Sequence, residues 1–155
     1  MEAFNLAQLT KEMVVKSIRA LGDPAQVAAG VLNGTLLARL KGRGLSNREV
    51  EEAVIETARG AMAGMVLMES SLPRGAAAIL AILSKTARQA GVNEPLVVIA
   101  GIKGMADVRR FTTAETLDQI SRRLEETRRG AGGVFDRSRA EHQSVQSQPA
   151  YRSPG

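Results

Sequence analysis

The feature that most constrains this chain is the helical spacing of apolar residues over positions 50–90, which is interrupted once, at 71–73. Apolar residues that recur at alternating intervals of three and four lie on one side of an α-helix. The interruption is short, and Pro73 is tolerated in the first turn of a helix. The pattern therefore predicts two consecutive antiparallel helices that face each other, the second ending at Gly91.

Two polar pairs mark predicted helix starts. Ser46 precedes Glu49 by three residues, and Thr112 precedes Glu115 by the same interval. This is the spacing of a capping box, in which a hydroxyl and a carboxylate each accept a hydrogen bond from the other residue's backbone N–H. The first pair opens the helix that continues past position 50. The second predicts a last, mostly solvated helix that runs to about residue 129.

Three further segments are predicted to be helical. Residues 6–21 and 24–40 carry apolar residues on one side, and residues 96–108 are apolar nearly all round. The first part of the last segment, 96–102, is rich in β-branched residues and is also compatible with a short buried strand. Because a lone strand would have no partner in this chain, we expect a helix there.

The expected fold class is all-α, a compact bundle of five or six amphipathic helices with a disordered C-terminal tail. The bundle domain is predicted at residues 1–129 and the polar tail at 130–155. The tail follows a glycine-rich run at 130–133, and its apolar residues are too few to offset the entropy of ordering it.

Composition limits the classes of protein that fit. Aromatic residues make up only 3% of the chain, which suits closely packed helices, and there is no cysteine to form a disulfide. No basic region followed by an apolar run resembles a secretory leader. No uncharged apolar run reaches the roughly 18 residues that a membrane-spanning helix needs. We therefore expect a cytoplasmic protein that is not transmembrane.

Glycines occur in pairs three or four residues apart within the predicted helices. Each glycine in a helix interior costs roughly 1 kcal/mol relative to alanine, and close approach of two helix backbones is the usual compensating gain. We therefore predict helix-packing positions at Gly30, Gly34, Gly60, Gly64, Gly101 and Gly104.

Residues 28–37, 58–67 and 99–108 share a small residue followed by two spaced glycines. They are either a degenerate duplication of a helical hairpin or alanine-rich helices that match by chance. The pattern over about residues 50–108 resembles uncharacterised bacterial Ala/Gly-rich helical-repeat proteins with RGAxxG-like repeats. It is also similar, more loosely, to phasins, the amphipathic helical proteins of storage-granule surfaces. The resemblance implies a helical fold and carries over no catalytic residue.

The sequence offers no convincing catalytic group. The only histidine, His142, falls in the predicted tail, where a general base would lack fixed geometry. Glu49, Glu52 and Glu56 share a helix side, but the Glu-x-x-His motif of helical di-iron sites is missing, which favours a solvated acidic surface. We therefore predict a non-enzymatic protein with no catalytic residue, no cofactor and no metal.

The turn at residues 41–48 leads into a helix N-terminus, where free N–H groups and the helix dipole can hold an anion. It lacks the preceding strand and the lysine position of a P-loop, so a plain polar turn is the alternative. The candidate anion-binding residues are Lys41, Arg43, Gly44, Ser46 and Arg48. We do not expect nucleic-acid binding, because the basic doublets near the C-terminus are interleaved with acids and the aromatics are scattered.

The first functional hypothesis is an interaction or scaffold module that forms a homo-oligomer or binds a partner helix through Gly/Ala-lined helix faces. Met62, Met65 and Met68 would supply adaptable contacts on its interaction surface, unless they belong to the core. The alternative is an amphipathic protein that binds a lipid or granule surface. A phosphate- or anion-binding protein, or an enzyme that uses the 41–48 loop, is the third.

Overall fold

The computed structural model describes residues 5–147, and within this range the chain is helical with no β-strand. The all-α prediction is confirmed, but the predicted count of five or six helices is wrong, because this range holds seven α-helices and one 3₁₀ helix. They are α1 (Leu6–Leu21), α2 (Pro24–Leu40), α3 (Asn47–Leu67), α4 (Leu72–Ala90), α5 (Glu94–Met105), η1 (Ala106–Phe111), α6 (Ala114–Thr127) and α7 (Ala131–Ser147).

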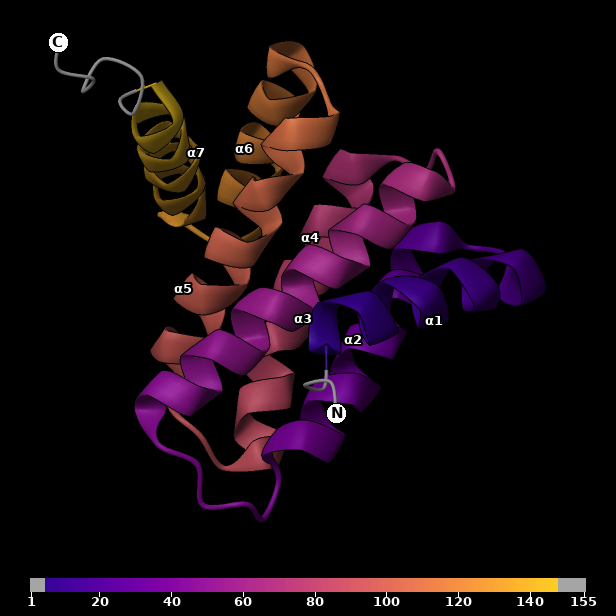
Figure 1. The fold of residues 1–155 in the computed structure, drawn as a ribbon, viewed down its shortest axis with the longest axis vertical. Coiled ribbons are helices and arrows are strands. Elements are labelled where there is room, and N and C mark those ends of the chain that lie inside the picture. Colours follow the sequence, from indigo (N-terminus) through magenta and orange to yellow (C-terminus); the bar gives the residue numbers. More distant parts are fainter. Residues whose placement is uncertain (1–4, 148–155) are drawn as a thin grey trace, which may run out of the picture.

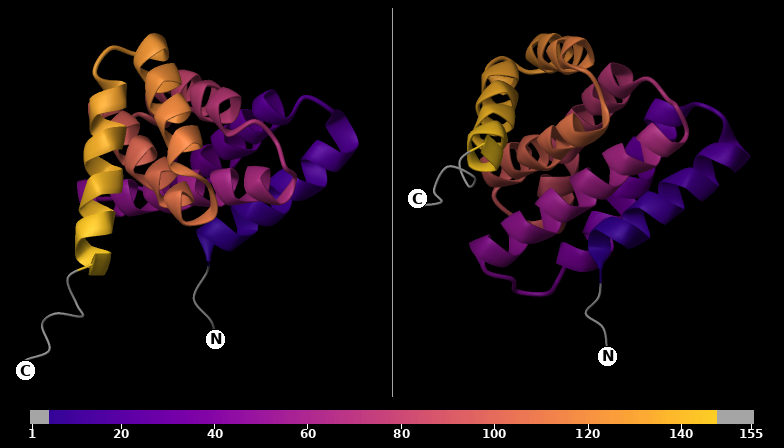
Figure 2. Two further views of the ribbon diagram at one scale, coloured as in Figure 1. Left: turned by 90° about the horizontal axis from the view of Figure 1, so that it is seen from above. Right: turned by 45° about the horizontal axis from the view of Figure 1, so that its top comes forward.

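The α-helices form two rows. Apart from α7, each helix packs chiefly against a helix two positions along the chain, so α1, α3 and α5 form one row and α2, α4 and α6 the other, and α7 packs against both α6 and α5. Figures 1 and 2 show α1 and α2 at one end of this array and α6 and α7 at the other. The predicted consecutive helices α3 and α4 are in contact, but α3 packs mainly against α1 and α5. As the terminal pair, α1 and α2 have other helices on one side only.

The helix starts follow local capping chemistry. Ser46 Oγ accepts a hydrogen bond from the Glu49 N–H at 3.2 Å, and the Glu49 carboxylate accepts one from the Ser46 N–H at 2.8 Å. The predicted capping box is therefore present. The predicted cap at Thr112 is displaced by one residue, because Thr113 Oγ1 accepts from the Thr116 N–H at 3.1 Å and α6 begins at Ala114.

The segment 96–102 is helical, which excludes the alternative of a strand. It lies within α5, whose start is capped by Asn93, and its side chains Val97 and Val98 are buried. The helix ends earlier than predicted, at Met105, and the chain continues as η1 to Phe111. Burial of apolar side chains on most sides of α5 outweighs the strand preference of β-branched residues.

Four of the predicted packing glycines lie at contacts between helices. A methyl group on Gly60 would overlap the backbone of Ala7 in α1, and one on Gly64 would lie 2.8 Å from Val14 Cγ1. A methyl group on Gly104 would overlap the backbone of α3, and one on Gly101 would overlap a Leu83 methyl of α4. Missing side chains thus allow α3 and α5 to approach their neighbours closely.

Gly30 and Gly34 behave differently. A methyl group at either position would have nothing within 4 Å among the described residues, and both glycines are exposed. The expected close packing at these two positions is therefore not present within residues 5–147. Their outer surface is the side of α2 that no other helix covers.

The predicted disorder from residue 130 is wrong for the segment 131–147, which forms α7 against α5 and α6. Phe135 is fully buried, and Ala131 and Ser138 are buried on the same side. The Glu125 carboxylate accepts hydrogen bonds from the N–H groups of Gly130 and Gly132 at 3.0 and 2.9 Å, which satisfies free donors at this helix start. The rest of the predicted tail, 148–155, lies outside the described residues.

Candidate functional site

The outer surface of α2 is an uncharged stripe of small residues. Its exposed positions are Gln26, Gly30, Gly34 and Ala38, each four residues from the next. No charged residue occurs in α2 before Arg39. Exposed stripes of helices in globular proteins usually carry charged and polar side chains. This stripe therefore differs from an ordinary solvated helix surface.

Beside the stripe, α1 and α2 form an apolar groove of about 660 Å³. Leu9 and Met13 line its α1 side and are 37% and 40% exposed, while Leu6 is buried at its base. We call this hollow the α1–α2 groove. Its lining residues are Leu6, Leu9, Met13, Gly30, Val31, Gly34, Thr35, Ala38, Arg39 and Arg43.

The groove continues along α2 toward the α1–α2 turn. Gly30 and Val31 also line a second hollow that reaches Asp23 and Ser17. Single exposed apolar side chains are common on protein surfaces, but a contiguous apolar hollow is typical of a binding surface. The α1–α2 groove is therefore the strongest candidate site in the described part of the chain.

Charge changes sign along the groove. Arg39 and Arg43 lie at the C-terminal end of α2, where Arg43 Nη2 donates a hydrogen bond to the Ala38 carbonyl at 3.3 Å. Asp23 lies beyond the other end, in the adjoining hollow, where its carboxylate accepts from the Ala25 N–H at 3.2 Å and is 3.8 Å from Arg74 Nη2. The groove and the adjoining hollow are thus basic at one end and acidic at the other, with an apolar centre.

Thr35 contributes a polar atom to the groove wall. Its Oγ1 is buried and has no hydrogen-bond partner among the described residues. By contrast, Thr10 and Thr57 each donate to the carbonyl four residues earlier, at 2.8 and 2.7 Å. A buried polar atom without a partner costs free energy. The Thr35 hydroxyl is therefore an unsatisfied polar group next to the groove.

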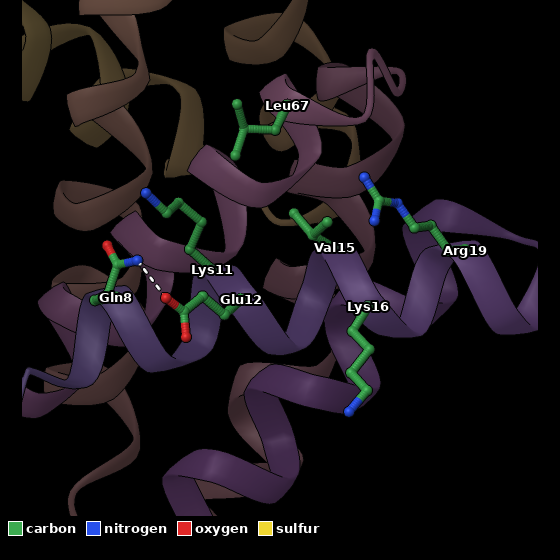
Figure 3. Close-up of a pocket in the computed structure, with 7 residues that line it drawn as sticks. All are labelled: Gln8, Lys11, Glu12, Val15, Lys16, Arg19 and Leu67. Atoms are coloured by element: carbon green, nitrogen blue, oxygen red, sulfur yellow. Dashed lines mark hydrogen bonds between the residues drawn. The ribbon is translucent and has the colours of Figure 1, made fainter.

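A separate hollow, of about 750 Å³, lies on the other side of α1 against the C-terminal end of α3. Figure 3 shows Leu67 on the side of α1 toward which the Lys11, Val15 and Arg19 side chains point, while the Lys16 side chain points away from Leu67. Leu67 is 62% exposed. Gln8 Nε2 donates to the Glu12 carboxylate at 2.6 Å within the same hollow. This surface combines an apolar side chain with basic groups.

Two of the backbone donors at the candidate anion site at 41–48 already have partners within the chain. The Ser46 and Glu49 N–H groups are already bonded within the capping box. These hydrogen bonds hold the pKa of the Glu49 carboxyl below its usual value, so its negative charge stays at the helix start. Arg48 Nε lies 3.3 Å from Glu52 Oε2. Lys41, Arg43 and Gly44 are exposed and close no pocket with Ser46 and Arg48.

The methionines of α3 do not form the expected surface. Met62 and Met65 are buried, at 1% and 0% exposure, and Met65 lies against Gly75 of α4. Met68 is half-buried against the core. In the α1–α2 groove, the exposed apolar residues that sequence reasoning missed are Leu9 and Met13. The only sequence signal for them was the unusually broad apolar face of residues 6–21.

The remaining sequence expectations concern metal binding, His142 and membrane-spanning helices. Among the described residues, no group of three acidic, histidine or cysteine side chains could hold a metal ion. His142 belongs to the range of α7, but its side chain lies outside the described part of the structure. Over the same described residues, no helix is long and apolar enough to cross a bilayer.

No protein-family model, curated protein or solved structure matches this chain. The function proposed below is therefore argued from the geometry of the α1–α2 groove.

Proposed function

We propose that this protein is a non-enzymatic helical interaction module, and that its α1–α2 groove takes up a helix from outside the chain. That helix belongs either to a second copy or to a partner protein. The observation that carries the proposal is the position of Gly30 and Gly34, which face open space in the floor of an apolar groove.

The energetics of the two glycines support this proposal. Each costs roughly 1 kcal/mol relative to alanine in a helix interior. At Gly60, Gly64 and Gly104 a neighbouring helix occupies the space that a side chain would fill, so contact within the chain accounts for the glycine. At Gly30 and Gly34 no such neighbour exists among the described residues. A helix docked from outside would supply the missing contact.

A peptide titration tests the proposal. The probe is a fluorescent, designed amphipathic peptide of about 18 residues with an Ala/Leu face, which spans about 27 Å when helical. We expect saturable binding to the full chain, measured by fluorescence anisotropy. Gly34→Leu should weaken binding at least tenfold, because the new side chain fills the groove. A tenfold loss corresponds to about 1.4 kcal/mol.

The matched control is Ala81→Leu, which adds a side chain to an exposed position of α4 outside the groove. It should bind the peptide as the unaltered chain does. The proposal fails if the unaltered chain neither binds the peptide nor self-associates in light scattering. It also fails if Gly34→Leu binds as tightly as Ala81→Leu.

A second candidate function is reversible binding to a lipid or granule surface. The hollow of Figure 3 favours it, because Leu67 is exposed there and Lys11, Lys16 and Arg19 also line it. Apolar side chains within a basic surface suit an interface that carries anionic head groups. Glu12 in the same hollow lowers its net positive charge.

Co-sedimentation with anionic liposomes tests this second function. Leu67→Ser combined with Lys16→Gln should reduce the bound fraction severalfold if the hollow contacts lipid. Gly34→Leu should leave lipid binding unchanged, because Gly34 lies in the α1–α2 groove and not in the hollow beside Leu67. No sedimentation of the unaltered chain with liposomes would exclude the lipid function and leave the interaction module.

A further inference from the structure

We propose that the occupant of the α1–α2 groove is the same groove of a second copy, with the two α2 helices antiparallel about a two-fold axis that passes through the outer surface of α2 midway between Gly30 and Gly34. This inference rests on the proposed function, because it names the partner that the groove takes up. Three observations carry it: the symmetry of the α2 stripe, the shape of the groove and the charge at its two ends.

The exposed stripe of α2 is symmetric about its midpoint. Gly30 and Gly34 lie equally far from Leu32, and so do Gln26 and Ala38. In a two-fold interface, a residue that contacts a second residue across the axis is matched by the reverse contact. Antiparallel α2 helices would place Gly30 of each copy opposite Gly34 of the other. Glycine against glycine permits close approach of the two backbones.

The shape of the groove also favours pairing with itself. Leu9 and Met13 stand exposed along one side, and the glycines leave a hollow along the other. With the two-fold axis perpendicular to α2, α2 lies against α2 and α1 against α1, so the exposed side chains of Leu9 and Met13 meet those of the second copy. This arrangement removes from water the apolar surface of Leu9 and Met13 in both copies at once.

Charge selects the antiparallel direction. Asp23 lies in the hollow that adjoins one end of the groove, and Arg39 and Arg43 line the groove at the other end. Antiparallel pairing brings the acidic end of each copy to the basic end of the other, whereas parallel pairing brings arginine to arginine. Asp23 is also 3.8 Å from Arg74 within its own chain, which weakens its attraction to a second copy. The charged ends therefore favour the antiparallel orientation of the two α2 helices, and the apolar centre of the groove supplies most of the contact.

The first measurement is the mass of the full chain by light scattering, from about 1 to about 100 µM, a range that brackets micromolar dissociation constants. We expect the mass to rise from one chain to two. Gly34→Leu should remain monomeric throughout, and Ala81→Leu should dimerise as the unaltered chain does. Both variants should keep their helical circular dichroism, because both positions are exposed.

The second measurement determines whether the two α2 helices of the dimer are antiparallel or parallel. The chain has no cysteine, so any cross-link forms only at the cysteine that is introduced. Gln26→Cys and Ala38→Cys variants are treated with a short bis-maleimide, separately and mixed. Antiparallel pairing predicts cross-linked dimers chiefly in the mixture, because Gln26 of one copy lies beside Ala38 of the other. Each variant alone should give little cross-linking.

The outcomes are distinguishable. A constant single-chain mass overturns the inference, and if the designed peptide still binds, the proposed function stands with a different partner. A dimer that persists in Gly34→Leu places the interface elsewhere and also overturns it. Efficient cross-linking of each cysteine variant with itself shows parallel helices and contradicts the antiparallel arrangement.

Discussion

Gly64 of α3 lies directly against Val14 of α1. A methyl group at Gly64 would lie 2.8 Å from Val14 Cγ1 and 3.0 Å from the Lys11 carbonyl oxygen, closer than ordinary van der Waals contact. The absence of a side chain at this position therefore sets the distance between α1 and α3. Because α1 also forms one wall of the α1–α2 groove, its position against α3 bears on the candidate site.

The first prediction concerns Gly64→Ala. The added methyl group would push α1 away from α3, and overpacking of this kind costs about 1–3 kcal/mol. Denaturant unfolding followed by circular dichroism should show a lower free energy of unfolding. A gain in stability would show that α1 and α3 can separate without loss and would contradict the close contact.

The second prediction concerns Gly34→Ala, the same substitution on the exposed side of α2. Its methyl group meets nothing within 4 Å among the described residues. Alanine favours the helix over glycine by roughly 1 kcal/mol, so the free energy of unfolding should rise by about 0.5–1 kcal/mol. The measurement is made at a concentration where the chain is monomeric. A loss of stability there would mean that Gly34 is packed within the chain.

The third prediction concerns Glu94, whose carboxylate accepts hydrogen bonds from Arg128 at 2.7 and 3.3 Å and one from the Ser84 hydroxyl. The Arg128 bonds, followed by the Ser84 bond, hold the pKa of the Glu94 carboxyl below its usual value of 4.5. Because the folded-state pKa is the lower one, this stabilisation is complete above the unfolded-state pKa. It is lost as pH falls through the folded-state pKa.

Glu94→Gln should therefore lower stability at neutral pH by up to about 1 kcal/mol, a modest value because both side chains are partly exposed. The difference from the unaltered chain should shrink as pH falls below about 4.5. Glu126→Gln, an exposed carboxylate on α6, is the matched control and should leave stability unchanged. An equal loss at every pH would show that the Glu94 charge is not responsible.

The fourth prediction concerns Phe135, which is fully buried where α7 packs on the bundle. Phe135→Ala should cost about 3–5 kcal/mol, as for other buried aromatic side chains. Val134→Ala, at a half-buried neighbouring position, should cost much less. Unfolding measured by denaturant titration distinguishes the two. Unchanged stability of Phe135→Ala would mean that α7 does not dock.

Local chemistry made several helix boundaries predictable from the sequence. Ser46 and Glu49 form the capping box that their spacing indicates, and α1 and α2 have the predicted limits. The error at α7 has a physical cause. Composition averaged over residues 130–155 hides a short buried stripe, Ala131, Phe135 and Ser138, whose spacing is helical.

The candidate site was harder to predict, because the same glycine pattern occurs inside and outside the core. Gly60 and Gly30 have similar neighbours in sequence, but only Gly60 lies against another helix. The difference depends on the order of helices in the two rows, which leaves α1 and α2 at the end. Periodicity identifies the side of a helix that is apolar, and it does not identify what covers that side.

The most direct test of the groove's role is an amide NMR titration of the full chain with the designed Ala/Leu-faced peptide. The interaction module predicts that the amide signals of Gly30, Gly34 and Ala38 shift together and saturate, while signals from α6 and α7 stay in place. If those three signals remain unmoved, or if the shifts gather on α6 and α7 instead, the α1–α2 groove is not the binding site.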